Sequence, residues 1–109
     1  MQPIPEKDWK RIRKVQQEKL GMACRSILDE IGRLVAQSQG AEHETYLKIW
    51  DTIRKEDKKI GRMFDGMSRG SAILKLMEWD RNGLLSDEEK SMFSPETQEI
   101  LRRIEEMHR

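Results

Sequence analysis

The stretch EKDWKRIRKVQQEKLGMACRSILDEIGRLVAQ, residues Glu6 to Gln37, decides the fold. Its apolar side chains recur mostly at steps of three and four residues, which is the period of an α-helix and not that of a strand. A helix of about 32 residues is roughly 48 Å long. The stretch therefore predicts one long helix, most of whose apolar stripe needs cover from other elements. The stripe consists of Trp9, Ile12, Val15, Leu20, Ala23, Cys24, Ile27, Leu28, Ile31, Leu34 and Val35.

A second long helix is predicted from Glu42 to Phe64, where apolar side chains again follow the helical period. The four residues 37–40 separate it from the first helix, and Gly40 is expected to serve there as a left-handed cap. So short a connection makes the two helices antiparallel neighbours. Gly21 and Gly32, inside the first helix, indicate either tolerated glycines or a close approach of another helix.

Three shorter helices are predicted after Asp65-Gly66, which closes the second helix. The first of them covers Ala72 to Trp79, with Ser68 or Ser71 as its cap, and ends at Asn82-Gly83. The second opens at Ser86, with Glu89 completing a capping box, and the third opens at Ser94-Pro95-Glu96 and carries Ile100, Leu101, Ile104 and Met107.

The predicted fold class is therefore all-α. We expect a long antiparallel helical hairpin with three shorter C-terminal helices packed as a bundle, in a single domain over residues 1–109. Residues 1–5 form an extended lead-in, since two of them are proline. No β-rich run is present, so about three-quarters of the residues should be helical.

Composition excludes several classes of protein. The 109 residues carry 21 Lys+Arg and 20 Asp+Glu, for a net charge of +1, which argues against a strongly basic or acidic tail. No apolar run approaches the ~18 residues of a membrane span. The single Cys24 and an N-terminus without a secretory pattern lead us to expect a cytoplasmic protein. No nucleophile–base pair, phosphate loop or redox cysteine pair is apparent, so neither an enzyme nor a cofactor is expected.

Several segments resemble a family of small, uncharacterised bacterial helical proteins. They are residues 8–14, 46–65, 83–89 and 93–97. The resemblance implies a bacterial, cytoplasmic, all-helical protein, and it implies no mechanism.

The segment 78–89 resembles the twelve-residue calcium loop of an EF-hand. The resemblance implies calcium ligands at five positions, but the first is glutamate where the motif has aspartate, and no second loop is present to pair with it. Two helix caps explain the same residues, and we expect no metal. The five positions are Glu78, Asp80, Asn82, Leu84 and Glu89.

The start of the first helix is basic, with a local charge of +4 between Lys7 and Lys19. Lys10, Arg11, Arg13 and Lys14 are candidate phosphate contacts, although such a run is more often a solvated helix face. Nucleic-acid binding through this helix is the second functional hypothesis, and a single EF-hand-like calcium site is the third.

The leading hypothesis is a non-catalytic protein–protein interaction or regulatory module whose partner is unknown. The first helix outruns its hairpin partner, which leaves Trp9, Ile12, Val15 and Leu20 in need of cover. Either the C-terminal helix or a second copy of the chain covers them. We expect a homodimer through these four residues, because a two-fold axis would also bring the basic helix start near the acidic C-terminal segment.

Overall fold

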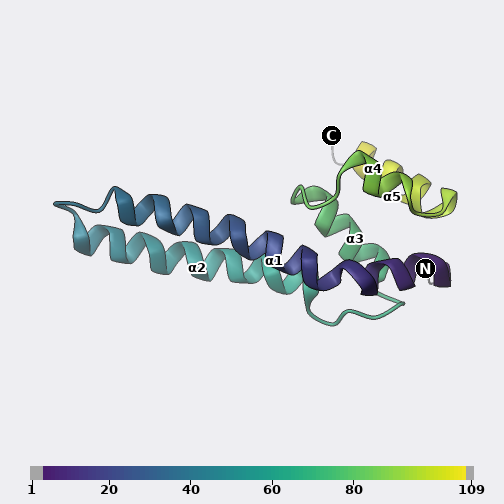
Figure 1. Ribbon diagram of the computed structural model, residues 1–109, viewed down its shortest axis with the longest axis horizontal. Helices are drawn as coiled ribbons and strands as arrows, with labels where there is room; N and C mark the ends of the chain where they lie inside the picture. Colours follow the sequence, from purple (N-terminus) through teal and green to yellow (C-terminus); the bar gives the residue numbers. More distant parts are fainter. Residues whose placement is uncertain (1–3, 108–109) are drawn as a thin grey trace.

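The computed structural model describes residues 4–107, which are 79% helical and contain no strand. This confirms the all-α prediction. The helices run in the order α1 (Glu6–Ala36), α2 (Glu42–Phe64), α3 (Ala72–Arg81), α4 (Asp87–Ser91) and α5 (Pro95–Met107). Figure 1 shows α1 and α2 as a long hairpin, with α3, α4 and α5 gathered at the end opposite its turn.

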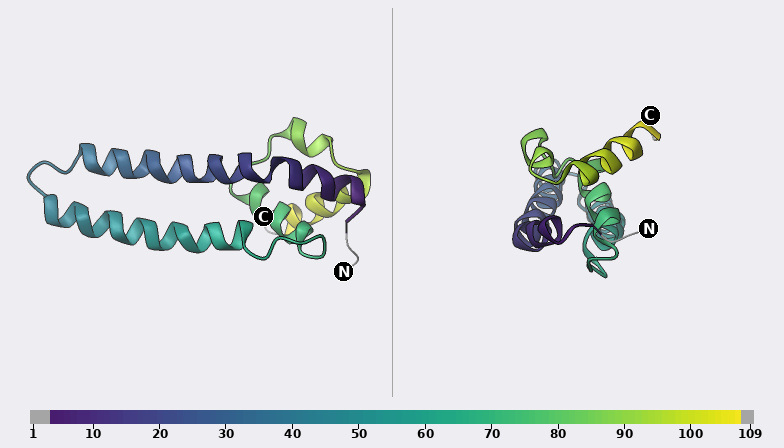
Figure 2. Two further views of the ribbon diagram at one scale, coloured as in Figure 1. Left: turned by 60° about the horizontal axis from the view of Figure 1, so that its bottom comes forward. Right: turned by 90° about the vertical axis from the view of Figure 1, so that its right-hand side faces the viewer.

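The hairpin sets the shape of the molecule, which measures 53 × 27 × 24 Å. Its two helices run side by side to a turn at one extreme of the long axis (Figure 2). The turn needs Gly40, whose φ is +84°, a value that side-chain-bearing residues rarely adopt. Gly40 is nevertheless not the cap of the first helix, because α1 already ends at Ala36 and its C-cap is Gln37.

The hydrophobic core lies at the other end of the hairpin, where α3 packs against both long helices. Trp79 is completely buried there, and its indole N–H donates to the carbonyl of Met63 at 3.0 Å. The Phe64 ring lies 5.6 Å from the Trp79 ring. Among residues 4–107, no buried hydrophobic residue falls between Ala23 and Met63. The distal hairpin, which we define as residues 24–62, is therefore only two helices thick.

Buried polar contacts fasten α5 to α1. Asp8 is almost fully buried, and its carboxylate accepts hydrogen bonds from the Ser94 backbone N–H at 2.9 Å and from the hydroxyls of Ser94 and Thr97, each at 2.6 Å. All three donors belong to the first turn of α5 or to the residue before it. A carboxylate at this helix N-terminus satisfies backbone and side-chain donors that burial would otherwise leave unpaired.

A second polar contact fastens α4 to α1. The Lys19 ammonium, also almost fully buried, pairs with Glu89, whose side chain is about a third exposed. Glu89 simultaneously accepts from the Ser86 backbone N–H, while its own N–H donates to the Ser86 hydroxyl. The predicted capping box is thus confirmed, and its glutamate has the additional task of compensating a buried lysine.

Two local expectations are corrected. Ser71 stands at the N-cap of α3, but its hydroxyl donates to the Gly66 carbonyl and makes no capping bond to that helix. Neither Gly21 nor Gly32 marks a close approach within the chain, because a Cβ built on either would have no neighbour within 4 Å. Both glycines face open space on α1.

Candidate functional site

The four residues predicted as an interaction surface are covered by the chain itself. Ile12 is completely buried, and Trp9, Val15 and Leu20 are half-buried against the same core. The first helix does outrun α2, but α3 and the C-terminal helices lie over its N-terminal half (Figure 2). Cover by the chain's own C-terminal helices, one of the two alternatives, therefore accounts for Ile12, and nothing in its burial requires a second copy of the chain.

The basic residues of α1 divide between two directions. Lys10, Arg11 and Lys14 line one shallow hollow of about 480 Å³. Lys7 completes it, and Glu6 lies at its edge, where it pairs with Lys10 at 3.9 Å. The spacing of Lys7, Lys10, Arg11 and Lys14 follows the i, i+3, i+4, i+7 rule for one helix face. Arg13 is exposed but does not line this hollow.

The residues of the EF-hand-like segment do not converge on a common point. Asn82 donates its side-chain N–H to the Glu78 carbonyl at 2.8 Å, and Asp80 pairs with Lys90 at 3.1 Å. The Leu84 N–H bonds the Trp79 carbonyl at 2.9 Å. Gly83, with φ +74°, closes α3 as a left-handed cap.

These contacts favour two helix caps over a calcium loop. Glu89, the candidate bidentate ligand, is engaged by Lys19 and Ser86. Within residues 4–107, no three His, Cys, Asp or Glu side chains group closely enough to hold a metal ion.

Electrostatics at the surface consist mainly of ion pairs within or between helices. Lys19 holds the pKa of the Glu89 carboxyl below its ordinary value, mainly through their hydrogen bond. Asp80 raises the pKa of Lys90 in the same way. Both pairs join α4 to another helix, so these shifts are explained by packing of the C-terminal helices.

A different surface stands out on the distal hairpin. Five large apolar side chains remain 41–66% exposed there although they belong to the apolar stripes of α1 and α2. We call this set the hairpin face: Leu28 and Val35 from α1, and Tyr46, Trp50 and Ile53 from α2. Contiguous apolar patches of this kind typically mark interaction sites.

The hairpin face lies on the side of the hairpin that α3 and α4 leave free. The opposite side carries a groove of about 420 Å³, lined by Ser26 and Ile27 of α1, Thr52 of α2, and Asn82 and Leu84 of the α3–α4 connection. Successive helical residues are rotated by about 100°, so Ser26 and Leu28 point to opposite sides of Ile27. Because Ser26 faces the groove, Leu28 faces away from it.

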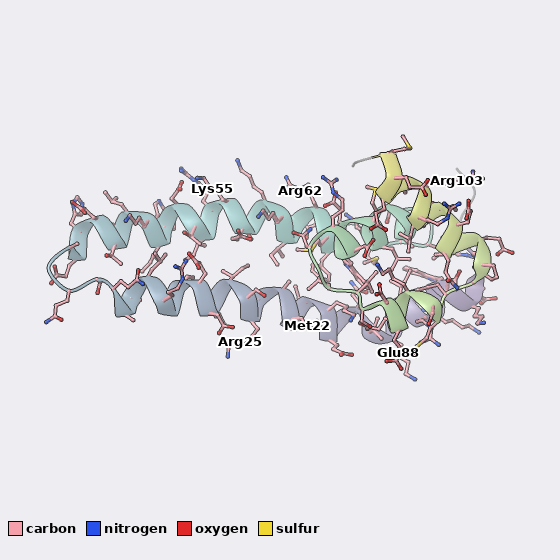
Figure 3. All side chains as sticks on the ribbon, turned by 90° about the horizontal axis from the view of Figure 1, so that it is seen from above. Met22, Arg25, Lys55, Arg62, Glu88 and Arg103 are labelled. Atoms are coloured by element: carbon pink, nitrogen blue, oxygen red, sulfur yellow. The ribbon has the colours of Figure 1, made fainter. Side chains whose placement is uncertain are left out.

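Charged residues occupy most of the remaining surface of the distal hairpin, where Leu47 is also exposed, at 48%. In Figure 3, Arg25 projects from the outer side of α1, whereas Lys55 of α2 lines the groove. Arg25 pairs with Asp29 at 3.6 Å and Lys55 with Asp51 at 2.9 Å. Both pairs lie outside the hairpin face, whose five side chains are all apolar or aromatic.

Sequence reasoning missed the hairpin face because periodicity alone does not tell which part of a stripe is covered. Leu28 stands beside the partly buried Ile27 in the apolar run of α1, and Trp50 stands beside the partly buried Ile49 in that of α2, although helical rotation points Leu28 and Trp50 to another side. One signal was available: no helical segment follows that is long enough to cover both ends of a hairpin of this length. Three short C-terminal helices suffice for one end only.

Comparison with protein-family models, with curated proteins and with solved structures finds no match to this chain. The resemblance to bacterial helical proteins stays a prediction. No helix over residues 4–107 combines the length and the apolar character that crossing a membrane requires.

Proposed function

We propose that this protein is a non-catalytic interaction module that binds a protein partner through the hairpin face. The observation that carries the proposal is the exposure of Trp50, at 61%, beside Tyr46, at 66%. Both lie on a side of the distal hairpin that no other described segment of the chain covers. Aromatic side chains are enriched at the centres of protein interfaces, where their burial contributes much of the binding energy. A helix or helix pair of the partner would pack against the hairpin face and cover it.

Photo-crosslinking from position 50 tests this function. A photoreactive phenylalanine analogue placed at Trp50 should give an adduct with a protein in cells that express the chain. The same analogue at Lys48, exposed on another side of α2, is the matched control and should give none. An adduct with a second copy and an adduct with a different protein both support the function. Absence of any adduct from position 50 would overturn it.

Binding to a nucleic-acid backbone is a second candidate, favoured by one observation. The structure brings Lys7, Lys10, Arg11 and Lys14 around one hollow, and Lys10 alone of these four forms an ion pair among the described residues. Four cations on one face suit contact with successive phosphates.

Anisotropy of a fluorescent oligonucleotide tests this second candidate. Affinity should fall steeply with salt, because every phosphate neutralised by a lysine or arginine releases a counterion. The double variant Lys7→Gln, Lys14→Gln should weaken binding and flatten the salt dependence. Arg13→Gln, which changes a charge outside the hollow, should have a smaller effect. No binding at low salt, or equal effects of the two variants, would remove the assignment to this hollow.

A further inference from the structure

Two lines of residues at heptad spacing, one on each helix, run through the hairpin face and extend beyond it. Gly21, Leu28 and Val35 form the line on α1, and all three are exposed. Residues seven apart lie nearly two full turns apart and share one side of a helix. Leu28 is the central residue of this line, and it lies eleven residues before Gln39 at the turn.

The matching line on α2 is His43, Trp50 and Asp57, and it is exposed throughout. Trp50 is its central residue and lies eleven residues after Gln39, so it is level with Leu28 along the antiparallel hairpin. The two lines therefore run side by side with their centres aligned.

We propose that this face binds the same face of a second copy of the chain, antiparallel, about a two-fold axis that lies in the interface plane and crosses both helices at the level of Leu28 and Trp50. The proposal rests on the proposed function and names its partner. A two-fold axis at this point brings each residue opposite the one that is equally far from the centre on the other side. Trp50 then meets the partner's Trp50, and Leu28 meets the partner's Leu28.

Charge is complementary in this arrangement. His43 and Asp57 lie seven residues on either side of Trp50, so His43 faces the partner's Asp57 and Asp57 faces the partner's His43. Neither side chain forms an ion pair among the described residues of the single chain. In the dimer, an imidazole and a carboxylate lie opposite each other at both symmetry-related positions.

Side-chain size is complementary as well. Gly21 and Val35 lie seven residues on either side of Leu28, so Val35 faces the partner's Gly21. Space for it exists, because a Cβ on Gly21 would touch nothing within 4 Å. Cys24 and Gly32 are likewise equidistant from Leu28, and Gly32 is open in the same way. On either side of the central Leu28 pair, the larger Val35 thus faces a glycine, which allows the two helices to approach closely.

The overlap is large enough for a stable dimer. The partner's turn at Gln39 would lie beside Gln17 and Gly61, which gives an overlap of about 22 residues, or roughly 33 Å, along two helices each about 10 Å wide. This corresponds to roughly 700 Å² per subunit, close to the ~800 Å² of a standard interface. The overlap stops before the connection 65–71, so that segment is not in the way.

Sedimentation equilibrium of the purified chain provides the first test. The wild-type chain should be a dimer at about 100 μM, a concentration that detects even micromolar affinity. Trp50→Glu should raise the dissociation constant by about 100-fold, because it places two carboxylates at the centre of the interface. Lys48→Glu is the matched control and should leave the dimer intact. Circular dichroism should show both variants folded, since both positions are exposed in the single chain.

A charge exchange tests the register. His43→Glu should weaken the dimer by about ten-fold, because it places a carboxylate opposite the partner's Asp57 and the two-fold axis repeats this like-charge contact. The double variant His43→Glu, Asp57→Lys should restore it. A different partner for this face predicts no such recovery.

The outcomes separate this inference from the function on which it rests. A wild-type chain that stays monomeric, or a dimer indifferent to Trp50→Glu, overturns self-association through the hairpin face. A dimer that Trp50→Glu abolishes but that the double charge exchange fails to restore overturns the antiparallel register. If the chain is monomeric and position 50 still crosslinks to a different protein, the interaction function stands and the second copy is excluded.

Discussion

At the scale of single residues, Asp8 is the clearest case of a polar side chain that specifies packing. Asp8 precedes Ser94 by 86 positions and Thr97 by 89, and its carboxylate accepts hydrogen bonds from both residues. A buried donor that loses its acceptor costs about 1–3 kcal/mol. Without Asp8, the Ser94 backbone N–H and the Thr97 hydroxyl would lose their acceptor in the core, and the Ser94 hydroxyl would keep only its 3.2 Å bond to the Thr97 hydroxyl.

We therefore predict that Asp8→Ala lowers the free energy of unfolding by about 3 kcal/mol. Asp8→Asn should cost less, because its amide oxygen still accepts from the Ser94 backbone N–H and its NH₂ group can donate to a hydroxyl of Ser94 or Thr97. Glu6→Gln, which removes an exposed carboxylate in the same helical turn, is the control and should leave the free energy of unfolding nearly unchanged. Urea denaturation measures all three, and equal stability of Asp8→Ala and wild type would contradict the role of Asp8.

The sequence predicts much of the local structure and little about which residues meet. Ser86 and Glu89 are identifiable as a capping box because both partners lie within one turn. The pairing of Asp8 with Ser94 and of Lys19 with Glu89 depends instead on how distant helices pack. Ala23 and Ile27 show the same limit for apolar residues: both lie on one side of α1, but only Ala23 is fully buried by the segments that follow the hairpin. The candidate site is therefore a tertiary property, although the helices that carry it are not.

At the scale of secondary-structure elements, α4 is too short to be stable by itself and depends on its bonds to α1. Lys19 and, to a lesser degree, the Ser86 backbone N–H hold the pKa of Glu89 below its ordinary value of 4.5, against the opposing effect of burial. A carboxyl whose pKa is lower in the folded than in the unfolded chain stabilises the fold at neutral pH. That contribution is lost as the pH falls through the folded-state pKa.

Glu89→Gln should consequently reduce stability by about 1–2 kcal/mol at neutral pH, the low end for a charged hydrogen bond because the carboxylate is partly exposed. The difference from wild type should shrink as the pH falls below 4.5, where the carboxyl of the unfolded chain becomes protonated, and should be lost below the lower folded-state pKa. Glu88→Gln, at an exposed neighbouring position, is the control. Urea titrations between neutral pH and about pH 3 measure the effect. A constant difference across this range would show that Glu89 does not act through its charge.

At the scale of the whole molecule, stability is distributed unevenly along the 53 Å axis. The buried hydrophobic residues lie between Ile4 and Ala23, at the end of α2, and in the segments that follow α2. Between these limits the two helices have only each other, together with surface ion pairs that contribute little. Segments with few buried contacts open locally at a lower free-energy cost than the core does.

Hydrogen–deuterium exchange should reveal this gradient in a chain held monomeric by Trp50→Glu. Backbone amides of the distal hairpin should exchange faster than those of α3, because local opening there exposes almost no core. In the wild-type chain, raising the protein concentration should slow exchange in the distal hairpin and leave α3 unchanged, since only the former gains a layer on self-association. Uniform exchange along the monomeric chain would contradict the uneven distribution of stability. Concentration-dependent protection centred on α3 would place the interface at the wrong end of the molecule.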